Sequence, residues 1–530
     1  MEALWNVIGK INTALWSNPM LFLALGSGLI FTICLRFVQV RKLKTMVGLL
    51  FNGKASDHGL SSFQAFTLAI AGRVGTGNIV GVATAICAGG PGALFWMWMI
   101  AIVGSATTFV ECTLSQLHKK KIDGEYKGGW VYYIGDKWKV IGGICSVLFI
   151  ATLAFTQTLV HSNAMSTALT NAFGIPPIVC GIVIAVILGA IVFGGVKVIA
   201  RVAEIVVPVM SVIYVLVALV ILAVNYQNIP AAFALIFKSA FGADQIIGAA
   251  MGSAMIWGTK RAIFSSETGM ATATPSAASA EVSHPAKQGL VQAFSVYIDT
   301  LFVCTATGLM LIITGCYSVQ GADGSFLFTG MGQVGADATW VQAAVSTLLP
   351  FGSQFVAVAL FFFAFTTILN QCYSTACSVS YFFADKGHEP KWVTKVCYGV
   401  FCLAAVYGSV IAANRAWDLG DTGLGLIVWI NYLFLLLSCP VAIKLLRDFE
   451  SQQKLGVDPV FDPDKFKGVK GFEHVDLNRL VHESVKKYGL LFVYKGLSVE
   501  IAPLAGSVVS DAKWLGFILE QLLSNAVKYT

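Results

Sequence analysis

Apolar stretches of about 20 residues recur along this chain from Leu21 to Leu446, and they restrict its fold more than any other feature. A stretch of that length crosses the hydrocarbon core of a bilayer as one α-helix, because a helix satisfies its own backbone polar groups there. Charged residues make up only 12% of the chain, against roughly a quarter in soluble domains. The sequence therefore predicts an all-α polytopic membrane protein.

Hydropathy and length predict about eleven transmembrane spans. They lie near 17–38, 64–87, 92–117, 141–162, 176–195, 203–225, 245–282, 289–315, 353–384, 393–412 and 423–446. We expect residues 1–450 to form one transmembrane domain.

Basic residues predict the orientation of these spans, because loops rich in Lys and Arg stay in the cytoplasm. They gather after the first, third, fifth and ninth spans: Arg36, Arg41, Lys42, Lys44 and Lys54; Lys119, Lys120, Lys121, Lys137 and Lys139; Lys197 and Arg201; Lys386, Lys391 and Lys395. The opposite loops hold little beyond Lys238 and Arg415. We therefore expect a multi-pass protein of the plasma membrane with its N-terminus outside and its C-terminus in the cytoplasm.

Two of the spans are interrupted by glycine and polar residues. The second span contains 71-AGRVGTGNIVG-81, and the seventh contains 253-SAMIWGTKRAIFSSETGMATATPSAASA-280. Because five spans separate the two breaks, the pattern indicates an inverted repeat of spans 2–6 and spans 7–11. An unwound helix exposes N–H groups and carbonyls that can hold an anion and a cation, so we expect a binding site at mid-membrane between the breaks.

Other interpretations of the glycine-rich stretch are open to test. A nucleotide-binding loop would need a Gly-Lys-Ser/Thr ending inside a βαβ unit, and neither is present in the sequence. Close helix packing through small residues is common in membranes and would also place glycines here. A channel is a third possibility, although two broken helices around one site are more typical of alternating access.

Several blocks of the sequence resemble the alanine or glycine:cation symporter family over about residues 15–466. The most specific blocks are GRVGTGNIVGVATAICAGGPGALFWMWM and IFSSETGMATATPSAASAEVSHPAKQGLVQAF. The resemblance implies a leucine-transporter-type fold with an added first helix. It also implies uptake of alanine, glycine or a related small neutral amino acid, driven by Na⁺ or H⁺, with no cofactor beyond the transported cation.

The resemblance also implies site residues. Thr76, Gly77, Asn78 and Gly269 would line the substrate region, and Gly75, Thr76, Thr366 and Thr367 would supply oxygen atoms to the cation, since hard cations prefer oxygen ligands. Each threonine hydroxyl could instead bond back to its own helix.

Two charged residues in the breaks are costly in a membrane unless they are paired or functional. Glu267 matches an acidic residue of the family, and its alternative role is as a structural partner of Lys260 or Arg261. Arg73 could pair with an acid such as Glu111 or Asp299. We assign Arg73 and Glu267 a structural or gating role.

The sequence departs from the family at two positions that are thought to face the substrate. In 160-VHSN-163, His161 replaces a glutamine, and in 370-NQCY-373, Gln371 stands where an aromatic residue is expected. A lost aromatic ring opens space, and a histidine adds a group that titrates near neutral pH. We therefore expect a pocket that admits a somewhat larger or more polar amino acid.

Nothing else in the sequence points to an enzyme or to a nucleic-acid partner. The 12 cysteines lie mostly in apolar runs and resemble small core residues, and no metal-ligand spacing or nucleophile triad is apparent. A basic cytoplasmic face could attract anionic lipid, so the net charge of +7 needs no nucleic acid to explain it.

The hydropathy falls sharply after residue 466. We expect residues 451–470 to be a cytoplasmic linker and residues 471–530 a small α+β fragment. The segment 511-DAKWLGFILEQLLSNAVKYT-530 resembles a helix of the ATP-binding domain of sensor histidine kinases, but the glycine-rich boxes of that domain are missing. The two hypotheses are a symporter with a truncated, inactive fusion and a transporter-like sensor coupled to a kinase module.

Overall fold

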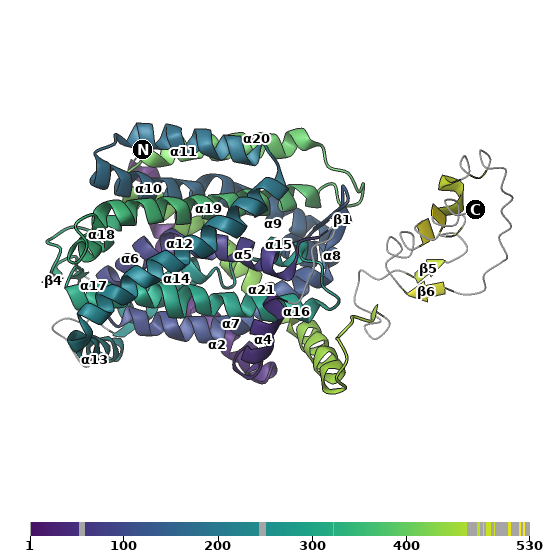
Figure 1. Ribbon diagram of the computed structural model, residues 1–530, viewed down its shortest axis with the longest axis horizontal. Coiled ribbons are helices and arrows are strands. Elements are labelled where there is room, and N and C mark those ends of the chain that lie inside the picture. Colours follow the sequence, from purple (N-terminus) through teal and green to yellow (C-terminus); the bar gives the residue numbers. More distant parts are fainter. Residues whose placement is uncertain are drawn as a thin grey trace. The chain divides into compact units, whose positions relative to one another are not determined.

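The computed structural model describes residues 2–51, 59–242, 251–321 and 323–463, and short pieces between 474 and 524. The chain divides into two compact units, Met1–Lys454 and Leu455–Thr530. The first unit is a bundle of helices (Figure 1). Of the second unit, the structure describes one antiparallel strand pair, β5 (His474–Asp476) with β6 (Ser507–Val509), so most of the predicted kinase-like fragment 471–530 lies outside the described residues.

The described helices of the first unit fall into two groups along the chain. Those of the first half are α1 (Glu2–Leu15), α2 (Asn18–Cys34), α3 (Val38–Arg41), α4 (Leu43–Leu50), α5 (Ser62–Arg73), η1 (Gly77–Gly81), α6 (Val82–Gly89), α7 (Ala93–Leu117), α8 (Trp130–Lys137), α9 (Lys139–Ala151), η2 (Thr152–Gln157), α10 (Thr158–Phe173), α11 (Pro177–Val192), α12 (Val196–Val224), η3 (Tyr226–Asn228) and α13 (Ile229–Ala240). Those of the second half are α14 (Met251–Ser266), α15 (Thr274–Ser279), α16 (Pro285–Val296), η4 (Tyr297–Cys304), α17 (Thr305–Thr314), α18 (Ala338–Ser346), α19 (Gly352–Tyr381), α20 (Lys391–Val410) and α21 (Ala413–Lys454).

Two short hairpins lie between helices of the first unit. β1 (Lys120–Ile122) pairs antiparallel with β2 (Glu125–Lys127), and β3 (Ser318–Gln320) pairs antiparallel with β4 (Phe326–Thr329). The second hairpin has an irregular register between Val319 and Gln320.

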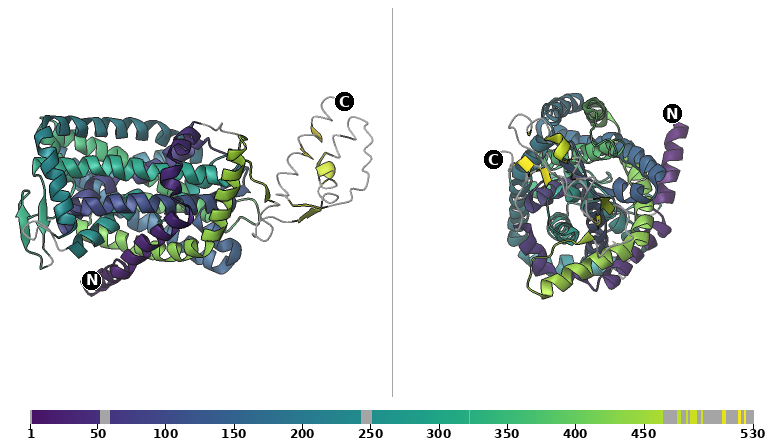
Figure 2. Two further views of the ribbon diagram at one scale, coloured as in Figure 1. Left: turned by 90° about the horizontal axis from the view of Figure 1, so that it is seen from below. Right: turned by 90° about the vertical axis from the view of Figure 1, so that its right-hand side faces the viewer.

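The prediction of a polytopic helical membrane protein is confirmed. In the described part of the chain, eight helices are long and apolar enough to cross a bilayer, and the bent pair α5 with η1–α6 makes a ninth. Two further predicted spans, near 176–195 and 245–282, correspond to the shorter apolar helix α11 and to α14 with α15. Helix α1 lies before the first predicted span and was not predicted, because its sequence EALWNVIGKINTAL mixes polar and apolar residues; from Trp5 onward it belongs to the candidate span Trp5–Cys34. It lies on the outside of the bundle against α21 (Figure 2).

The first helix break lies where the glycine-rich stretch predicted it. Helix α5 begins at a capping box, in which Ser61 and Gln64 exchange side-chain and backbone hydrogen bonds, and it ends at Arg73. Val74 is extended, with φ −74° and ψ 90°, and the chain continues as the π-helix η1. The two halves of the span differ in direction by 48°.

The second break is a turn of seven residues between α14 and α15. Glu267, Gly269 and Ala271 all have positive φ, at 55°, 73° and 65°. Only glycine adopts this conformation without steric cost, so the turn holds two other residues in a conformation that the surrounding structure must stabilise. The helix of this span is therefore broken by a turn, in addition to the polar and small residues that interrupt its apolar sequence.

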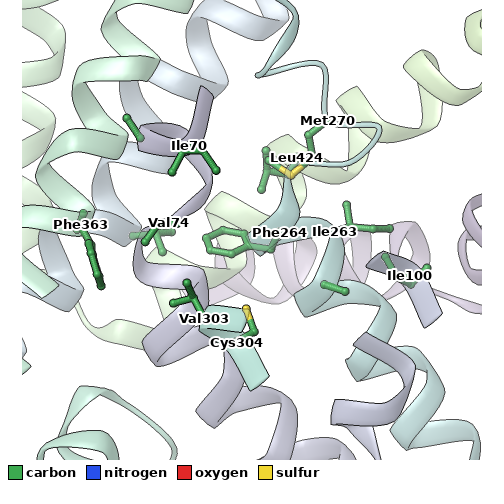
Figure 3. Close-up of a cluster of buried hydrophobic side chains, with 14 of the residues drawn as sticks. Ile70, Val74, Ile100, Ile263, Phe264, Met270, Val303, Cys304, Phe363 and Leu424 are labelled. Carbon is green, nitrogen blue, oxygen red and sulfur yellow. The ribbon is translucent and has the colours of Figure 1, made fainter. Parts of the chain in front are cut away.

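The two breaks lie against each other. A Cβ on Gly77 would come within 2.8 Å of the Ser265 Cα, so only glycine permits this approach of η1 to α14. Apolar side chains from both breaks pack around the contact, with Val74 near Phe264 and Met270 on the second turn (Figure 3). The breaks thus occupy one place in the core, five spans apart in sequence.

Replacing Gly269 with alanine tests the second turn. We expect Gly269→Ala to lower the unfolding free energy by more than about 1 kcal/mol, because a Cβ would adopt a left-handed backbone and meet the Tyr432 ring at 2.4 Å. Gly48→Ala, in a helix with open space around the Cβ, is the matched control and should be neutral or stabilising. Thermal unfolding in detergent measures both, and equal melting temperatures for the two variants would contradict the expectation.

Candidate functional site

A small cavity lies where the two breaks meet two unbroken spans. Its volume of about 10 Å³ holds roughly one water molecule. It is lined by residues of the first break, the second break, α10 with η2, and α19: Gly72, Arg73, Gly75, Thr76, Gly77, Gln157, His161, Phe264, Glu267, Met270, Thr367 and Gln371. Most of the residues that the sequence analysis proposed for the site therefore border one cavity; Asn78, Gly269 and Thr366 do not line it.

Asn78 shapes the first break from behind the cavity. Its Oδ1 accepts a hydrogen bond from the Gly75 N–H at 2.7 Å, and its Nδ2 donates to Asp299 Oδ1 at 2.6 Å. The first bond satisfies a backbone donor that the unwound segment leaves without a helical partner. Asn78 thus holds the backbone of the break and connects it to an acid on η4.

The two threonines of α19 have different environments. The Thr366 hydroxyl lies within hydrogen-bond distance only of carbonyls of its own helix, Phe362 O and Phe363 O, among the contacts of the described residues. The Thr367 hydroxyl also contacts a carbonyl of its own helix, Phe363 O, at 2.9 Å. Unlike Thr366, it in addition reaches the Ala71 carbonyl of the first break, at 3.0 Å, and a Cβ on Gly75 would meet it at 2.4 Å. Of the two, Thr367 is the one positioned to share a cation with carbonyls of the break.

Glu267 borders the cavity and faces the first break. A Cβ on Gly72 would lie 2.8 Å from Glu267 Oε2, and this oxygen has no hydrogen-bond partner in the structure. The alternative role of Glu267, as the partner of Lys260 or Arg261, does not match the geometry, because both of those cations pair with Asp421.

Gly269 does not line the cavity and packs against Tyr432. Its N–H donates to Glu111 Oε1 at 3.4 Å, and its carbonyl accepts from Asn431 Nδ2 at 2.9 Å. Its position supports the turn that carries Glu267.

Arg73 connects the two breaks. Its Nε donates to the Ser266 carbonyl at 2.7 Å, and its Nη1 donates to the Ser295 hydroxyl. Among the described residues, Arg73 forms no hydrogen bond or ion pair with Glu111 or Asp299, the partners expected from the sequence. Its Nη2 has no hydrogen-bond partner there either. Arg73 therefore joins the two breaks, and its Nη2 remains available as a hydrogen-bond donor beside the cavity.

Asp299 is a further candidate functional residue. From the sequence it was expected only as a partner for Arg73. It is fully buried and accepts hydrogen bonds from Asn78, from the Ser265 hydroxyl at 3.1 Å and from the Thr300 hydroxyl at 2.7 Å. All its partners are neutral. The sequence signal that could have found it is an aspartate in the middle of an apolar span, which by itself suggests function.

Each of the three π-helical elements in the described part of the chain carries a residue at or beside this site. Asn78 lies on η1, Gln157 on η2 and Asp299 on η4. A π-helical turn is rare and widens the helix locally, and such turns are frequent at functional sites. Hydropathy could not predict where these π-helical turns lie, because a π-turn changes the direction in which side chains point and leaves the residue types of the span unchanged.

The wall formed by α10 and α19 is polar. His161 Nδ1 lies 2.8 Å from the Thr76 hydroxyl, and His161 Nε2 lies 3.0 Å from Gln371 Nε2. Gln371 Oε1 is buried without a hydrogen-bond partner.

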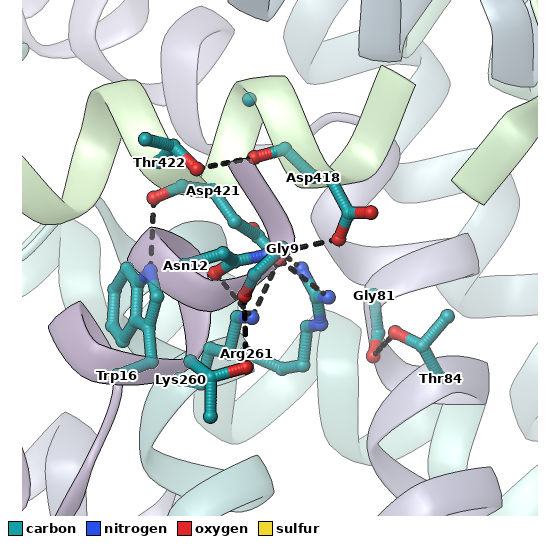
Figure 4. A network of polar contacts seen from close by, with 12 residues as sticks. Gly9, Asn12, Trp16, Gly81, Thr84, Lys260, Arg261, Asp418, Asp421 and Thr422 are labelled. Carbon is teal, nitrogen blue, oxygen red and sulfur yellow. Dashed lines mark hydrogen bonds and ion pairs between the residues drawn. The ribbon is translucent and has the colours of Figure 1, made fainter. Parts of the chain in front are cut away.

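A buried ion cluster closes the site toward α1. Arg261 makes two hydrogen bonds to Asp421, at 3.1 and 3.0 Å, and Lys260 lies 2.7 Å from the same carboxylate (Figure 4). The Trp16 indole of the N-terminal segment donates to the Asp421 carbonyl at 2.8 Å. Arg261 also stacks on Trp417, 4.3 Å from the ring centroid, and Trp417 packs on Phe264 of the cavity wall. The cluster joins α14 to α21 directly above the cavity lining.

A multi-pass bundle with two interrupted spans around one small polar cavity defines a secondary membrane transporter. The sequence pattern of the sodium:alanine symporter family matches residues 1–463, and the chain belongs to that family. It is a multi-pass membrane carrier and not an enzyme.

Three relatives illustrate the similarity. The putative sodium/proton-dependent alanine carrier protein YrbD of Bacillus subtilis (strain 168) is 48% identical over 90% of this chain and 98% of that protein. The sodium/proton-dependent alanine carrier protein of Bacillus sp. (strain PS3) is 44% identical over 80% of this chain and 96% of that protein. The probable sodium/glutamine symporter GlnT of Bacillus subtilis (strain 168) is 39% identical over 89% of this chain and 96% of that protein.

The Asp421 cluster gives a stability prediction. We expect Asp421→Asn to cost about 3 kcal/mol or more, because it leaves two buried cations without a carboxylate. Asp385, which also contacts two lysines but at the surface, is the matched control, and Asp385→Asn should cost less than about 1 kcal/mol. Thermal unfolding in detergent compares them, and a similar small loss for both would show that the buried cluster contributes little.

Proposed function

We propose that the chain takes up alanine, glycine or a related small neutral amino acid by alternating access, coupled to inward movement of a monovalent cation, Na⁺ or H⁺. The observation that carries the proposal is the small cavity, lined by polar side chains, at the junction of two broken spans. Interrupted spans of this kind form the substrate sites of many secondary transporters. The names of the two alanine-carrier relatives support the same substrate and the same choice of cations.

The balance of buried charge supports coupling to a cation. The breaks, the helices packed against them and the ion cluster together hold four buried carboxylates and three buried cations. The carboxylates are Glu111, Glu267, Asp299 and Asp421, and the cations are Arg73, Lys260 and Arg261. At least one carboxylate therefore lacks a fixed counter-charge, and an uncompensated charge at that depth is costly. A bound Na⁺ or a proton would supply the missing positive charge.

The two broken spans that border one small cavity favour a carrier over a channel, because interrupted spans around a central site are typical of alternating access.

The location we propose is the plasma membrane, with the N-terminus outside. Basic residues near the β1–β2 hairpin support a cytoplasmic position for that loop. In the structure, Lys127 forms an ion pair with Glu389 at 3.0 Å, and this interaction raises the pKa of Lys127 against the opposing effect of burial. Lys127 therefore keeps its positive charge at neutral pH.

Uptake into proteoliposomes tests the proposed function. Labelled alanine should accumulate when an inward Na⁺ or H⁺ gradient is imposed and should not accumulate without one. A sample cut after Lys467 should transport equally if the tail is a passenger. Failure of labelled alanine, glycine and serine to enter under either gradient would refute the proposal.

Removing the Asp299 charge tests the cation coupling. We expect Asp299→Asn to weaken activation of uptake by Na⁺, or by H⁺ if that is the coupling ion, by about tenfold or more, because it removes a buried charge that the cation would neutralise. Asp323→Asn, an aspartate in the exposed loop after the same span, is the control and should leave activation unchanged. Unchanged cation activation in Asp299→Asn would exclude this residue from coupling.

For residues 471–530 we propose a passenger segment that transport does not require. The match to the symporter family ends at residue 463. A sensor coupled to a kinase module is the alternative. Binding of an ATP analogue by the full chain, lost on the cut after Lys467, would favour that alternative.

A further inference from the structure

We propose that the wall formed by α10 and α19 recognises a hydroxyl group on the substrate side chain, so that the site prefers serine to alanine. The inference rests on the proposed function, because it concerns the side-chain end of the same amino-acid site. The residues that carry it are Thr76, His161 and Gln371.

These three residues form one chain of hydrogen bonds. Thr76 contacts one nitrogen of the His161 ring at 2.8 Å, and Gln371 contacts the other at 3.0 Å. A neutral imidazole has one donor and one acceptor nitrogen, so the two neighbours must use opposite roles. If His161 donates to Thr76, it accepts from the Gln371 amide N–H and leaves Gln371 Oε1 without a partner, as in the structure.

The other tautomer gives the same conclusion. If His161 donates from Nε2, the Gln371 amide must turn its oxygen to the ring, and its NH₂ is then the group without a partner. In both arrangements the ring holds one end of the Gln371 amide and leaves the other end unsatisfied in a buried site. A hydroxyl can satisfy either arrangement, because it both donates and accepts, whereas a methyl group satisfies neither.

The wall borders the same cavity as the two breaks. Thr76, His161 and Gln371 all line this cavity. Gln371 lies one helical turn from Thr367, whose hydroxyl contacts the Ala71 carbonyl of the first break, so Gln371 is on the same face of α19. A substrate that occupies the cavity would therefore lie within reach of the Gln371 amide.

Glutamine is the competing polar substrate to be tested, because one relative carries the name of a glutamine symporter.

The test is competition for labelled alanine uptake by the full chain in proteoliposomes, with serine, 2-aminobutyrate, alanine and glutamine as competitors. Serine and 2-aminobutyrate have the same size and differ only in a hydroxyl against a methyl group. We expect serine to compete at least about fivefold better than 2-aminobutyrate and than alanine, because those substrates leave the Gln371 amide unpaired.

The variant Gln371→Leu should remove the advantage of serine over 2-aminobutyrate, measured as the ratio of the two competition constants in that variant. Gln227→Leu, an exposed glutamine outside the site, is the control and should keep the wild-type ratio. If Gln371→Leu does not fold, the wild-type ratio of serine to 2-aminobutyrate decides by itself.

Three results would overturn the inference: equal competition by serine and 2-aminobutyrate, an unchanged ratio in Gln371→Leu, or stronger competition by glutamine than by serine. These outcomes leave cation-driven alanine uptake intact, so they are distinct from failure of the proposed function. Absence of any cation-driven uptake in the wild type would refute that function and the inference together.

Discussion

The Arg73 guanidinium holds the ends of two helices together, and the geometry of the whole centre depends on it. Arg73 is the last residue of α5, and its Nε donates to the carbonyl of Ser266, the last residue of α14. Both helix ends carry unsatisfied carbonyls and the negative end of a helix dipole, which a cation stabilises. In the interior of a membrane protein, where water does not take over these carbonyls, one buried cation compensates for two interrupted helices.

The remaining polar groups of the centre follow from that junction. Asn78 satisfies the backbone of one break, and Asn431 and Glu111 satisfy the backbone of the other at Gly269. Glycines permit the approach, since a side chain at position 77 would collide with Ser265. The result is a cavity whose walls are preorganised by hydrogen bonds to backbone, so that a small substrate meets fixed groups rather than mobile ones.

The buried charged residues of this centre fall into two groups, one with ion-pair partners and one without. Lys260, Arg261 and Asp421 form compact ion pairs that join α14 to α21. Glu267 and Asp299, in contrast, have only neutral hydrogen-bond partners or an oxygen without any partner. Ion pairs of the first kind hold elements in place, whereas carboxylates of the second kind are suited to exchange a proton or a cation during transport.

Much of this architecture was predictable from the sequence, because hydropathy and glycine placement are local properties. The apolar runs predicted the spans, the interruptions at 71–81 and 253–280 predicted the breaks, and the family motifs indicated Thr76, Glu267 and Thr367 beside one another. Helix α1 was missed because its composition is mixed. The partners of Arg73, Lys260 and Arg261 were not predictable either, because which acid meets which cation depends on how helices far apart in sequence are rotated and packed.

The sequence by itself determined that this chain spans a membrane many times and breaks two of its helices, since burial of backbone polar groups in lipid leaves few other solutions. Only the tertiary structure decided which polar groups share the cavity. It placed Asp299 behind Asn78, turned Thr366 back to its own helix, and put Gln371 against His161 with one amide atom unpaired. The physical reason is that hydrogen bonds need atoms within about 3 Å, a precision that the pattern of residue types along the chain does not contain.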